Sequence, residues 1–436
     1  LAGRGAQVIM TDEKPLSLLE NALEDASPPN GRVEWAAHHP DILAGVDLVV
    51  PSPGIPPAQE ILLAAVRLGI PILSELEIAS RFLQRPMIAI TGTNGKTTTT
   101  TLAGHILSQA GKKVFVGGNI GTPLIAYVDG PQDDDYAVLE VSSFQLQWID
   151  TFRPFIAALL NTTSDHVDYH GTFAAYRAAK ERIFENQGPA DFAIVNADDP
   201  EAERLLAGLA ARPIRFSFTG MPAEAGLYVE KNEIVYFPAA GAMERYPLEM
   251  IKIPGRHNVE NVMVALAVAR LCGCAPTPIT KAIGGFQGLS HRIEFAGRVD
   301  GVDFYDDSKG TNVDAVQRAL ETFTAPVVLL MGGRDKEGDF ASLARIITEK
   351  AKTLILFGES RERIRGLVGG LVHTVAATTM REAVQAARSE AAAGDVVLLS
   401  PGCASFDEFK DYKDRGEVFQ RMVREFQQEG FTRQAS

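Results

Sequence analysis

The segment TGTNGKTTTT, residues 91–100, restricts the possible folds of this chain more than any other stretch. The apolar run MIAI at residues 87–90 has the composition of a buried strand. Residues 97–110 have the apolar spacing of a helix, which Gly111 would terminate. The segment therefore predicts a glycine-containing turn between a strand and a helix, which is the local arrangement used to hold phosphate groups.

The residues of this turn indicate what it would bind. Gly92 and Gly95 allow close approach of the backbone, and Lys96 adds a positive charge beside the free N–H groups of the helix start. The hydroxyl of Thr97 follows, where nucleotide-binding loops place a magnesium ligand. The common pattern has glycine at the position of Ile90, so an ordinary turn capped by threonines is the alternative. The residues expected to contact the nucleotide are Gly92, Thr93, Asn94, Gly95, Lys96, Thr97 and Thr98.

Composition and charge restrict the partners. The chain has 436 residues, of which 46% are hydrophobic and 22% charged, as in a soluble globular protein of about two to four domains. Its net charge of −13 offers no general attraction to nucleic acid or to an anionic membrane, and its apolar runs are too short to span a bilayer. Three cysteines are too few and too ill spaced for disulfides or zinc. We therefore expect a cytoplasmic protein with neither nucleic-acid nor membrane partners. We also expect a monomer, although composition does not bear on this point.

Residues 1–86 predict an incomplete nucleotide-binding fold. Strands are expected at AQVIM (6–10) and VDLVV (46–50), the first followed by an acidic turn and the second by the loop PSPGIPP. In doubly wound folds, the acid after the second strand lies about 20 residues beyond the first glycine-rich turn. Here that turn would precede residue 1. We therefore expect a Rossmann-like domain that is truncated, without its first strand and phosphate loop.

The rest of the chain predicts an α/β protein. From residue 87 to about 288, strands alternate with helices, which indicates a mainly parallel sheet, followed by two antiparallel strands (LYVE and EIVYF) and a long helix from about Asn258. From 289 to 436, four strands each run into a polar loop. These units are FYDDSKGTN, VVLLMGGRDKEGD, LILFGES and VVLLSPGCASFDEF. Ligands bind outside the carboxyl ends of such strands, so these loops are expected to form one face of a cleft.

Polar groups are expected beside the phosphate loop. Glu140 ends a strand next to that of the loop, where a carboxylate is well placed for magnesium, although an exposed strand-end acid is the alternative. The run NTTSDHVDYH (161–170) offers Asp165, His166, Asp168 and His170 to a metal or a phosphate, but its spacing also suits a solvated loop. Lys180 lies in an expected helix, where a lysine is most often a solvated surface charge.

Two further groups suit a nucleotide and other anions. Asn258 and Asn261 share a face at a helix start, and their amides suit a purine edge, although Asn258 fits equally well as the N-cap of the helix. The third segment adds local charge to an acidic chain. These residues are His291, Arg292, Asp307, Lys309 and Lys336.

Taken together, these stretches resemble the Mur ligase family across nearly the whole chain. The motifs are TGTNGKTTT, GGNIGTP, LEVSSFQL, NTTSDHVDYHGTF, AYRAAKERIF, GRHNVEN, LSHRIE, DDSKGTN, LLMGGRDK and LLSPGCASFDEFKDYKDRG. DDSKGTN and SPGCASFDEF resemble the branch that adds D-glutamate. The resemblance implies a Rossmann-like domain for the UDP-substrate (1–86), a central ATP-binding domain (87–288) and a Rossmann-like domain for the amino acid (289–436).

The resemblance also implies an activity. Family members of this branch use ATP to phosphorylate the carboxylate of UDP-N-acetylmuramoyl-L-alanine, and D-glutamate then attacks the acyl phosphate in peptidoglycan precursor synthesis. Two magnesium ions and a carbamylated lysine, at the position of Lys180, are implied as well. The alternatives are a relative that adds another amino acid, a folylpolyglutamate-synthase-like ligase, or a non-catalytic nucleotide-binding protein.

Residue roles follow from the same resemblance. Catalytic roles are implied for Lys96, Asn119, His166, Lys180 and Lys309, and metal binding for Thr97, Glu140, His166 and Lys180. Nucleotide contacts beyond the loop are implied for Asn258, Asn261, Arg292 and Asp307. Substrate contacts are expected at Asp12, Lys14, Ser52 and Gly54 for the UDP end, at Ser142 and Gln145, and at Thr311, Lys336, Ser405 and Tyr412 for D-glutamate. Tyr412 departs from the family, which often has phenylalanine there.

Overall fold

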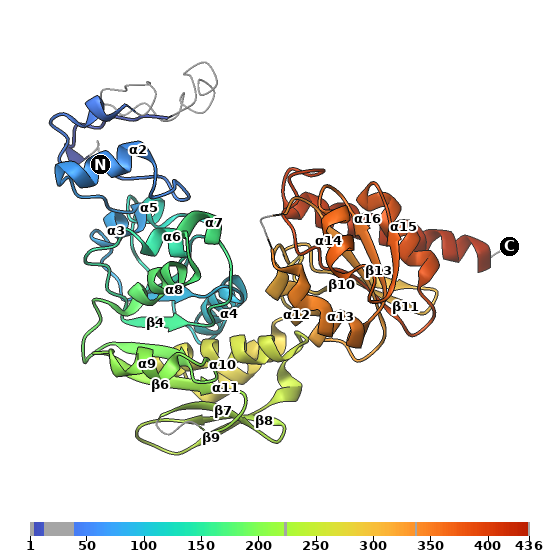
Figure 1. Ribbon diagram of the computed structural model, residues 1–436. Coiled ribbons are helices and arrows are strands. Elements are labelled where there is room, and N and C mark those ends of the chain that lie inside the picture. Colours follow the sequence, from blue (N-terminus) through green and yellow to red (C-terminus); the bar gives the residue numbers. More distant parts are fainter. Residues whose placement is uncertain (1–3, 13–38, 222–224, 336–337, 435–436) are drawn as a thin grey trace.

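The computed structural model describes residues 4–12, 39–221, 225–335 and 338–434. Two sheets organise the chain. The larger has nine strands in the order β2-β3-β1-β4-β5-β6-β7-β8-β9, and the smaller has six in the order β10-β11-β15-β12-β13-β14. Figure 1 shows the N-terminal segment in blue next to the central body that contains the larger sheet, and the C-terminal body in orange on the other side.

The strands of the larger sheet are β1 (Met87–Thr91), β2 (Val114–Gly118), β3 (Tyr136–Glu140), β4 (Ile156–Leu159), β5 (Phe192–Asn196), β6 (Arg212–Ser217), β7 (Gly226–Glu230), β8 (Glu233–Phe237) and β9 (Glu244–Pro247). Those of the smaller sheet are β10 (Glu294–Val299), β11 (Val302–Asp306), β12 (Val327–Gly332), β13 (Ala351–Phe357), β14 (His373–Ala376) and β15 (Val396–Leu399).

The helices of the N-terminal segment and central body are η3 (Pro40–Leu43), α2 (Glu60–Leu68), α3 (Glu75–Ser80), α4 (Lys96–Gln109), α5 (Leu124–Tyr127), α6 (Ser143–Leu146), α7 (Val167–His170), α8 (Phe173–Glu181), η4 (Arg182–Phe184), α9 (Ala202–Ala207), η5 (Leu248–Met250), α10 (Arg256–Leu271) and α11 (Pro276–Gly285). The C-terminal body adds α12 (Val313–Glu321), η6 (Phe340–Leu343), α13 (Ala344–Lys350), α14 (Arg361–Val368), α15 (Met380–Glu390) and α16 (Tyr412–Gln434).

The central strand of the larger sheet is β1, which pairs in parallel with β3 and β4. Every residue of β1 is buried, because helices cover both faces of the sheet. Leu102 of α4 and Val262 of α10 pack on one face, while Leu76 of α3 and Leu146 of α6 pack on the other. Strands buried on both faces read as continuous apolar runs, which is why MIAI identified this strand. The predicted parallel sheet and the antiparallel β7–β8 pair are both confirmed.

The N-terminal segment differs from the prediction. Residues 6–10 form no strand, and residues 46–50 contribute only an isolated bridge between Val49 and Ile72. A strand is stable only where a neighbour satisfies its backbone groups, and an apolar run by itself does not supply that neighbour. Both strand predictions were therefore wrong, and the Rossmann-like character of this segment stays a prediction.

Glu77 attaches the N-terminal segment to the central body. This side chain on α3 is fully buried and accepts hydrogen bonds from the backbone N–H groups of Asp150 (3.0 Å) and Phe152 (2.8 Å) and from the hydroxyl of Thr151 (2.6 Å). Arg81 pairs with it at 2.7 Å. A buried carboxylate with this many donors fixes α3 on the central sheet. The predicted boundaries at 86 and 288 stay predictions, with β1 beginning at 87 and β10 at 294.

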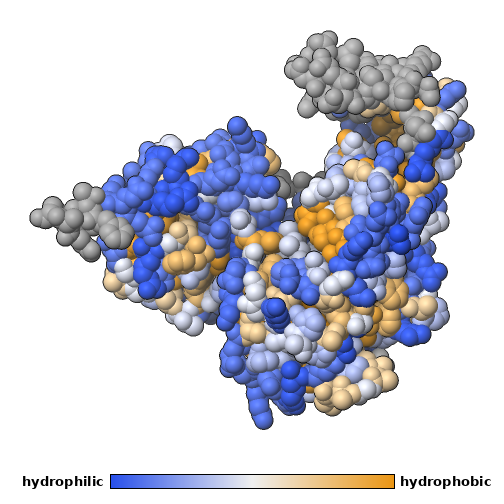
Figure 2. All heavy atoms as spheres, turned by 180° about the vertical axis from the view of Figure 1, so that it is seen from behind, coloured by the Kyte–Doolittle hydropathy of each residue, from blue (hydrophilic) through white to orange (hydrophobic). Residues whose placement is uncertain are grey.

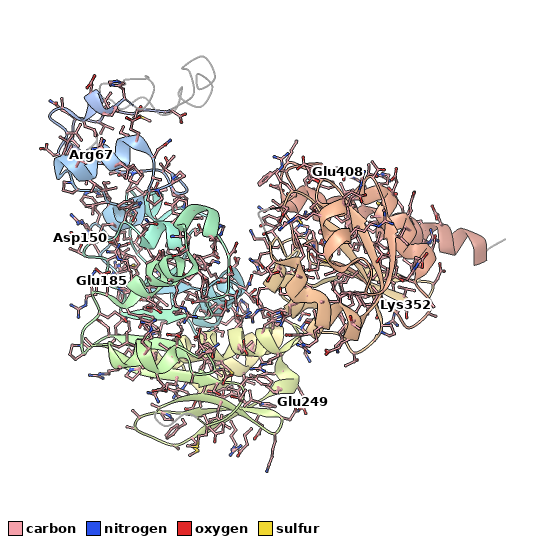
Figure 3. All side chains as sticks on the ribbon, viewed as in Figure 1. Arg67, Asp150, Glu185, Glu249, Lys352 and Glu408 are labelled. Carbon is pink, nitrogen blue, oxygen red and sulfur yellow. The ribbon has the colours of Figure 1, made fainter. Side chains whose placement is uncertain are left out.

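Charged side chains lie mainly on the outside of the molecule. Figure 3 labels six exposed examples, which are Arg67, Asp150, Glu185, Glu249, Lys352 and Glu408. Seen from behind in Figure 2, the surface recedes between the central and C-terminal bodies. Within the described ranges, no helix is long and apolar enough to cross a membrane.

Candidate active site

The phosphate loop joins β1 to α4, as predicted, and its shape depends on glycine. Gly95 is the N-cap of α4 with φ of +84°, in the left-handed region. A Cβ there would lie 2.3 Å from the side-chain oxygen of Asn261, so a larger residue would require that neighbour to move. Asn161 holds the loop from outside: its Oδ1 accepts from the N–H of Asn94 at 2.9 Å, and its backbone oxygen accepts from Thr93 at 3.0 Å. The loop is thus preformed.

Two lysines converge on one carbonyl oxygen in this loop. Lys96 Nζ donates to the backbone oxygens of Gly92 (2.9 Å) and Thr93 (2.8 Å). Lys180 Nζ, from α8, donates to the same Gly92 oxygen at 2.9 Å. Lys180 is 2% exposed, so its interpretation as a solvated surface charge was wrong: its face of α8 packs against the loop.

The convergence of the lysines has an electrostatic consequence. Burial lowers the pKa of both side chains, and the charge of Lys96 adds to the lowering at Lys180, whose pKa falls well below its usual value. Like charges held this close favour either a neutral amine or the arrival of an anion. The loop is therefore built to receive negative charge, as the phosphate-binding prediction requires.

Glu140 supplies a free carboxylate oxygen beside this cluster. It pairs in register with Ile90, at the carboxyl end of β3, and is 2% exposed, so the alternative of an exposed strand-end acid was wrong. Its Oε1 accepts from Asn119 Nδ2 at 2.8 Å. Its Oε2 is buried without a hydrogen-bond partner among the described residues. A buried carboxylate oxygen left unpaired is costly unless a cation occupies its free side, which fits a metal ligand.

The loop after β4 makes specific side-chain contacts. His166 is the N-cap of α7 with φ of +52°, and its ring packs edge-on against Phe144, with centroids 4.7 Å apart. Its Nε2 lies 3.7 Å from Asp165 Oδ2. His170 Nε2 is 3.0 Å from the hydroxyl of Ser143. Non-glycine residues with positive φ persist where surrounding contacts hold them, often at functional sites, and this one supports the predicted role of His166.

A pocket behind the phosphate loop contains both predicted asparagines. Asn258 and Asn261 line it together with Asn94, Gly95 and Thr98. Asn261 Nδ2 donates to Asn258 Oδ1 at 3.1 Å, and Asn258 Nδ2 donates to the Pro254 oxygen at 2.6 Å. The N-cap of α10 is Gly255, so the interpretation of Asn258 as an N-cap was wrong.

The C-terminal body reaches into the same pocket. Arg292 Nη2 donates to the Thr97 hydroxyl at 2.7 Å, across 195 residues of sequence. Asp307 also lines the pocket and is buried, which raises its pKa to about 7, although the hydroxyl of Ser400 donates to it at 2.7 Å. The structure thus places Arg292 and Asp307 in the lining of the same pocket as the two asparagines, and their contacts with a nucleotide stay a prediction.

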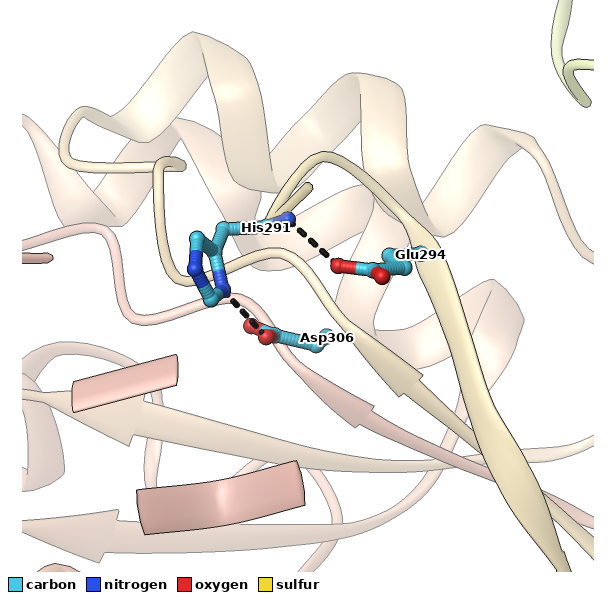
Figure 4. A group of neighbouring side chains, drawn as sticks. All are labelled: His291, Glu294 and Asp306. Carbon is cyan, nitrogen blue, oxygen red and sulfur yellow. Dashed lines mark hydrogen bonds and ion pairs between the residues drawn. The ribbon is translucent and has the colours of Figure 1, made fainter. Parts of the chain in front are cut away.

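A hydrogen-bonded cluster fixes the segment from which Arg292 projects. His291 Nδ1 lies 2.7 Å from Asp306 Oδ2, and the backbone N–H of His291 donates to Glu294 at 2.8 Å. Figure 4 shows both contacts as dashed lines. The hydrogen bond to Asp306 raises the pKa of His291 despite burial. Gln420 Nε2 bridges both acids, at 2.8 Å to Glu294 and 2.9 Å to Asp306. Since this amide occupies the space between the carboxylates, the cluster is a structural brace.

The brace holds unusual backbone. His291 and Ile293, the neighbours of Arg292, have φ of +64° and +48°. Such conformations cost about 1–3 kcal/mol each and need surrounding contacts to persist. Sequence reasoning missed Asp306 and Gln420, because nothing local connects residues 114 positions apart.

For the remaining predicted residues, the structure gives burial and some contacts, and their roles stay predictions. Lys309 Nζ lies 4.0 Å above the ring of Tyr412, the first residue of α16, and Ser405 is buried, while Thr311 is half-buried. Ser142 and Gln145 form the capping box of α6, so their polar groups already contact each other. Asp12 is half-buried, and Ser52 and Gly54 lie in an exposed turn of the N-terminal segment. Lys14 and Lys336 lie outside the described residues.

The site has the features of one class of protein, the enzymes that transfer a phosphoryl group from a nucleotide. These features are a glycine-lysine-threonine loop, a buried acid with one unpaired oxygen, and an arginine from a second body. Two family models identify the family within this class. The model of the Mur ligase middle domain matches residues 90–269, and the model of the Mur ligase glutamate ligase domain matches residues 291–403.

Named relatives are similar in sequence to this chain over nearly its full length. The UDP-N-acetylmuramoylalanine--D-glutamate ligase of Syntrophus aciditrophicus is 58% identical over 427 residues, which are 98% of this chain and 94% of the relative. The protein of the same name from Geobacter metallireducens is 44% identical over 425 residues, 97% of this chain and 93% of the relative. This chain belongs to the Mur ligase family.

Solved structures share the fold at low sequence identity. The MurF ligase from Thermotoga maritima in complex with ADP aligns with a TM-score of 0.64 at 17% identity, covering 88% of this chain and 95% of that one. The UDP-N-acetylmuramate-alanine ligase MurC from the same organism aligns with a TM-score of 0.57 at 19% identity, covering 97% and 94%.

Proposed function

We propose that this chain is an ATP-dependent ligase that joins D-glutamate to UDP-N-acetylmuramoyl-L-alanine in peptidoglycan precursor synthesis. The observation that carries the proposal is the cluster of Lys96, Lys180 and Arg292 around the phosphate loop, facing the unpaired oxygen of Glu140. The names of relatives up to 58% identical support the choice of substrates. The protein acts in the cytoplasm as a monomer in this proposal.

The first step transfers the γ-phosphoryl group to the substrate carboxylate. A carboxylate oxygen forms a bond to the γ-phosphorus while the bond to the β-γ bridging oxygen breaks, which releases ADP and leaves an acyl phosphate. Both reactants are anionic, so the barrier is largely charge repulsion. At ~4 Å and an effective dielectric constant of about 20, each opposite charge offsets roughly 4 kcal/mol of it. Lys96 and Arg292 are placed to supply these charges.

The second step forms the amide. The amine of D-glutamate attacks the acyl carbon, loses a proton, and the tetrahedral intermediate expels inorganic phosphate. Asn119 and His166 steady the acyl phosphate in this proposal. Asn119 donates a hydrogen bond to Glu140, and His166 lies beside Asp165 in the loop after β4. D-glutamate is received by Lys336 and by the hydroxyls of Thr311, Ser405 and Tyr412, because charge-assisted hydrogen bonds suit its two carboxylates. Lys309 reaches the nucleotide from the C-terminal body in this proposal.

Magnesium fits this site because Glu140 Oε2 is buried and unpartnered. Two Mg²⁺ ions would be held by Thr97, Glu140, His166 and Lys180. The ions would screen the phosphate charges. Lys180 acts as a carbamate in this proposal: its lowered pKa favours the neutral amine, which is the form that adds CO₂. The carbamate would then place a negative charge beside Lys96.

The test is amino-acid-dependent release of phosphate. With ATP, Mg²⁺ and UDP-N-acetylmuramoyl-L-alanine present, we expect D-glutamate to stimulate release at least about 100-fold more than L-glutamate, L-alanine or meso-diaminopimelate, because the site must place one amine at one carbon. Greater stimulation by another amino acid would assign the chain to another ligase activity. Binding of ATP without release under any condition would indicate a non-catalytic nucleotide-binding protein.

A further inference from the structure

The first turn of α12 connects the C-terminal body to both catalytic loops of the central body. Figure 1 shows α12 on the side of the C-terminal body that faces α4 and α10. Asp314 Oδ2 accepts a hydrogen bond from Asn94 Nδ2, in the phosphate loop, at 2.6 Å. Two residues earlier, Asn312 Nδ2 donates to Asp165 Oδ2 at 3.0 Å, next to His166. One helical turn therefore contacts the loop that holds phosphate and the loop expected to hold metal.

Both ends of the Asn94–Asp314 contact are rigid. The backbone of Asn94 is fixed by two hydrogen bonds with the amide of Asn161, at 2.9 and 3.1 Å. Asp314 sits within the first turn of a helix whose N-cap, Asn312, accepts from the Ala315 N–H at 2.8 Å. The same Asp314 oxygen accepts from Arg318 Nε at 2.8 Å. A short hydrogen bond between preorganised partners transmits position well, because little side-chain freedom is lost on forming it.

Arg318 continues the connection to the central body. Its Nη1 lies 3.8 Å from Glu260 Oε2 on α10, and Arg318 itself lines the nucleotide pocket. Asp314 is not among the residues that line this pocket. Asp314 contacts two residues that do line it, Asn94 and Arg318, so its effect on the reaction is exerted through them.

We infer that Asp314 is a positioning residue, which sets the closed arrangement of the C-terminal body against the phosphate loop through its hydrogen bond to Asn94. The inference rests on the proposed function, in which Arg292 and the amino-acid residues of the C-terminal body must meet the γ-phosphate. When the bond forms, Arg292 and Asn312 are brought to their partners on the central body at the same time.

The test separates positioning from nucleotide binding. Asp314→Ala removes the acceptor, and we expect kcat to fall about 10- to 100-fold, the loss typical of a hydrogen bond to a charged group. The KM for ATP should change less than kcat does, because Asp314 itself does not line the pocket, although Asn94 and Arg318, which do, each lose one hydrogen bond. Asp314→Asn keeps an oxygen that accepts from Asn94 and should retain kcat within about threefold. The control Glu362→Ala removes an exposed acid from the first turn of α14 and should leave kcat unchanged.

A double-mutant cycle identifies the partner. If the contact with Asn94 carries the effect, Asn94→Ala combined with Asp314→Ala is no slower than the slower single variant. Additive losses, an Asp314→Asn variant as slow as Asp314→Ala, or an unchanged kcat in Asp314→Ala would each overturn the inference.

A scattering measurement does not depend on activity. With ATP and Mg²⁺ present, we expect a larger radius of gyration for Asp314→Ala than for the unsubstituted chain, because the C-terminal body is no longer held, and an unchanged radius for Asp314→Asn. Equal radii for Asp314→Ala and the unsubstituted chain would overturn the inference. If the unsubstituted chain releases no phosphate but Asp314→Ala still has the larger radius of gyration, the result would contradict the proposed function alone.

Discussion

Replacing Lys96 with alanine is expected to lower the rate of D-glutamate-dependent phosphate release by about 10³-fold or more, the scale on which a single positive charge acts on a transferring phosphoryl group. Lys96 Nζ lies among the backbone oxygens of the loop and is fixed within 2.9 Å of two of them. Removing it takes away charge where the like-charged reactants meet and leaves Gly92 with the hydrogen bond from Lys180 alone.

Steady-state assays of Lys96→Ala and of the control Lys113→Ala, an exposed lysine beyond α4, measure this effect. The control should keep the rate of the unsubstituted chain. Because Lys96 is half-buried and hydrogen-bonded to the loop, the melting temperature of each variant is measured as well. A folded Lys96→Ala protein with more than about a tenth of the original rate would show that the loop does not act on the phosphoryl group.

Replacing Lys180 with alanine is expected to reduce the rate on a similar scale, about 10³-fold, because the carbamate would be a fixed charge beside the reacting groups. A small carboxylate such as acetate should restore part of the activity by occupying the vacated space with negative charge. If the lysine acts as a cation instead, methylamine should restore activity and acetate should not.

The control for this variant is Lys281→Ala, an exposed helical lysine on α11 that should behave as the unsubstituted chain. The pH dependence gives a second readout. Because burial lowers the pKa of Lys180, its neutral amine accumulates as pH rises through that lowered value, and addition of CO₂ becomes more favourable in the same direction. Stimulation by bicarbonate that is absent from Lys180→Ala is the expected result, and equal stimulation of both proteins would contradict the carbamate.

The sequence was sufficient for the phosphate loop and for the strand that carries Glu140, and the reason is local. An apolar run followed by Gly92, Gly95 and Lys96 specifies a strand, a turn and a helix within about 20 residues. Parallel strands end at the same edge of a sheet, so Glu140 could be placed beside the loop without knowing any contact.

Lys180 marks where such reasoning fails. A lysine on a helix is usually exposed, and only the packing of α8 against the loop decides which face is buried. The N-terminal strand predictions failed for a related reason: among the described residues, 6–10 pair with no strand and 46–50 form only the bridge between Val49 and Ile72. The contact between Asn94 and Asp314 joins residues 220 positions apart, and no spacing rule predicts it.

The central claim is that the site activates a carboxylate by phosphorylating it, and transfer of an oxygen isotope tests this most directly. UDP-N-acetylmuramoyl-L-alanine with ¹⁸O in its carboxylate is converted with ATP, Mg²⁺ and D-glutamate, and the released phosphate is analysed by mass spectrometry. An acyl phosphate places one ¹⁸O atom in each phosphate, because the carboxylate oxygen that attacked phosphorus leaves with it. Phosphate without the label, or label found in AMP, would contradict the account.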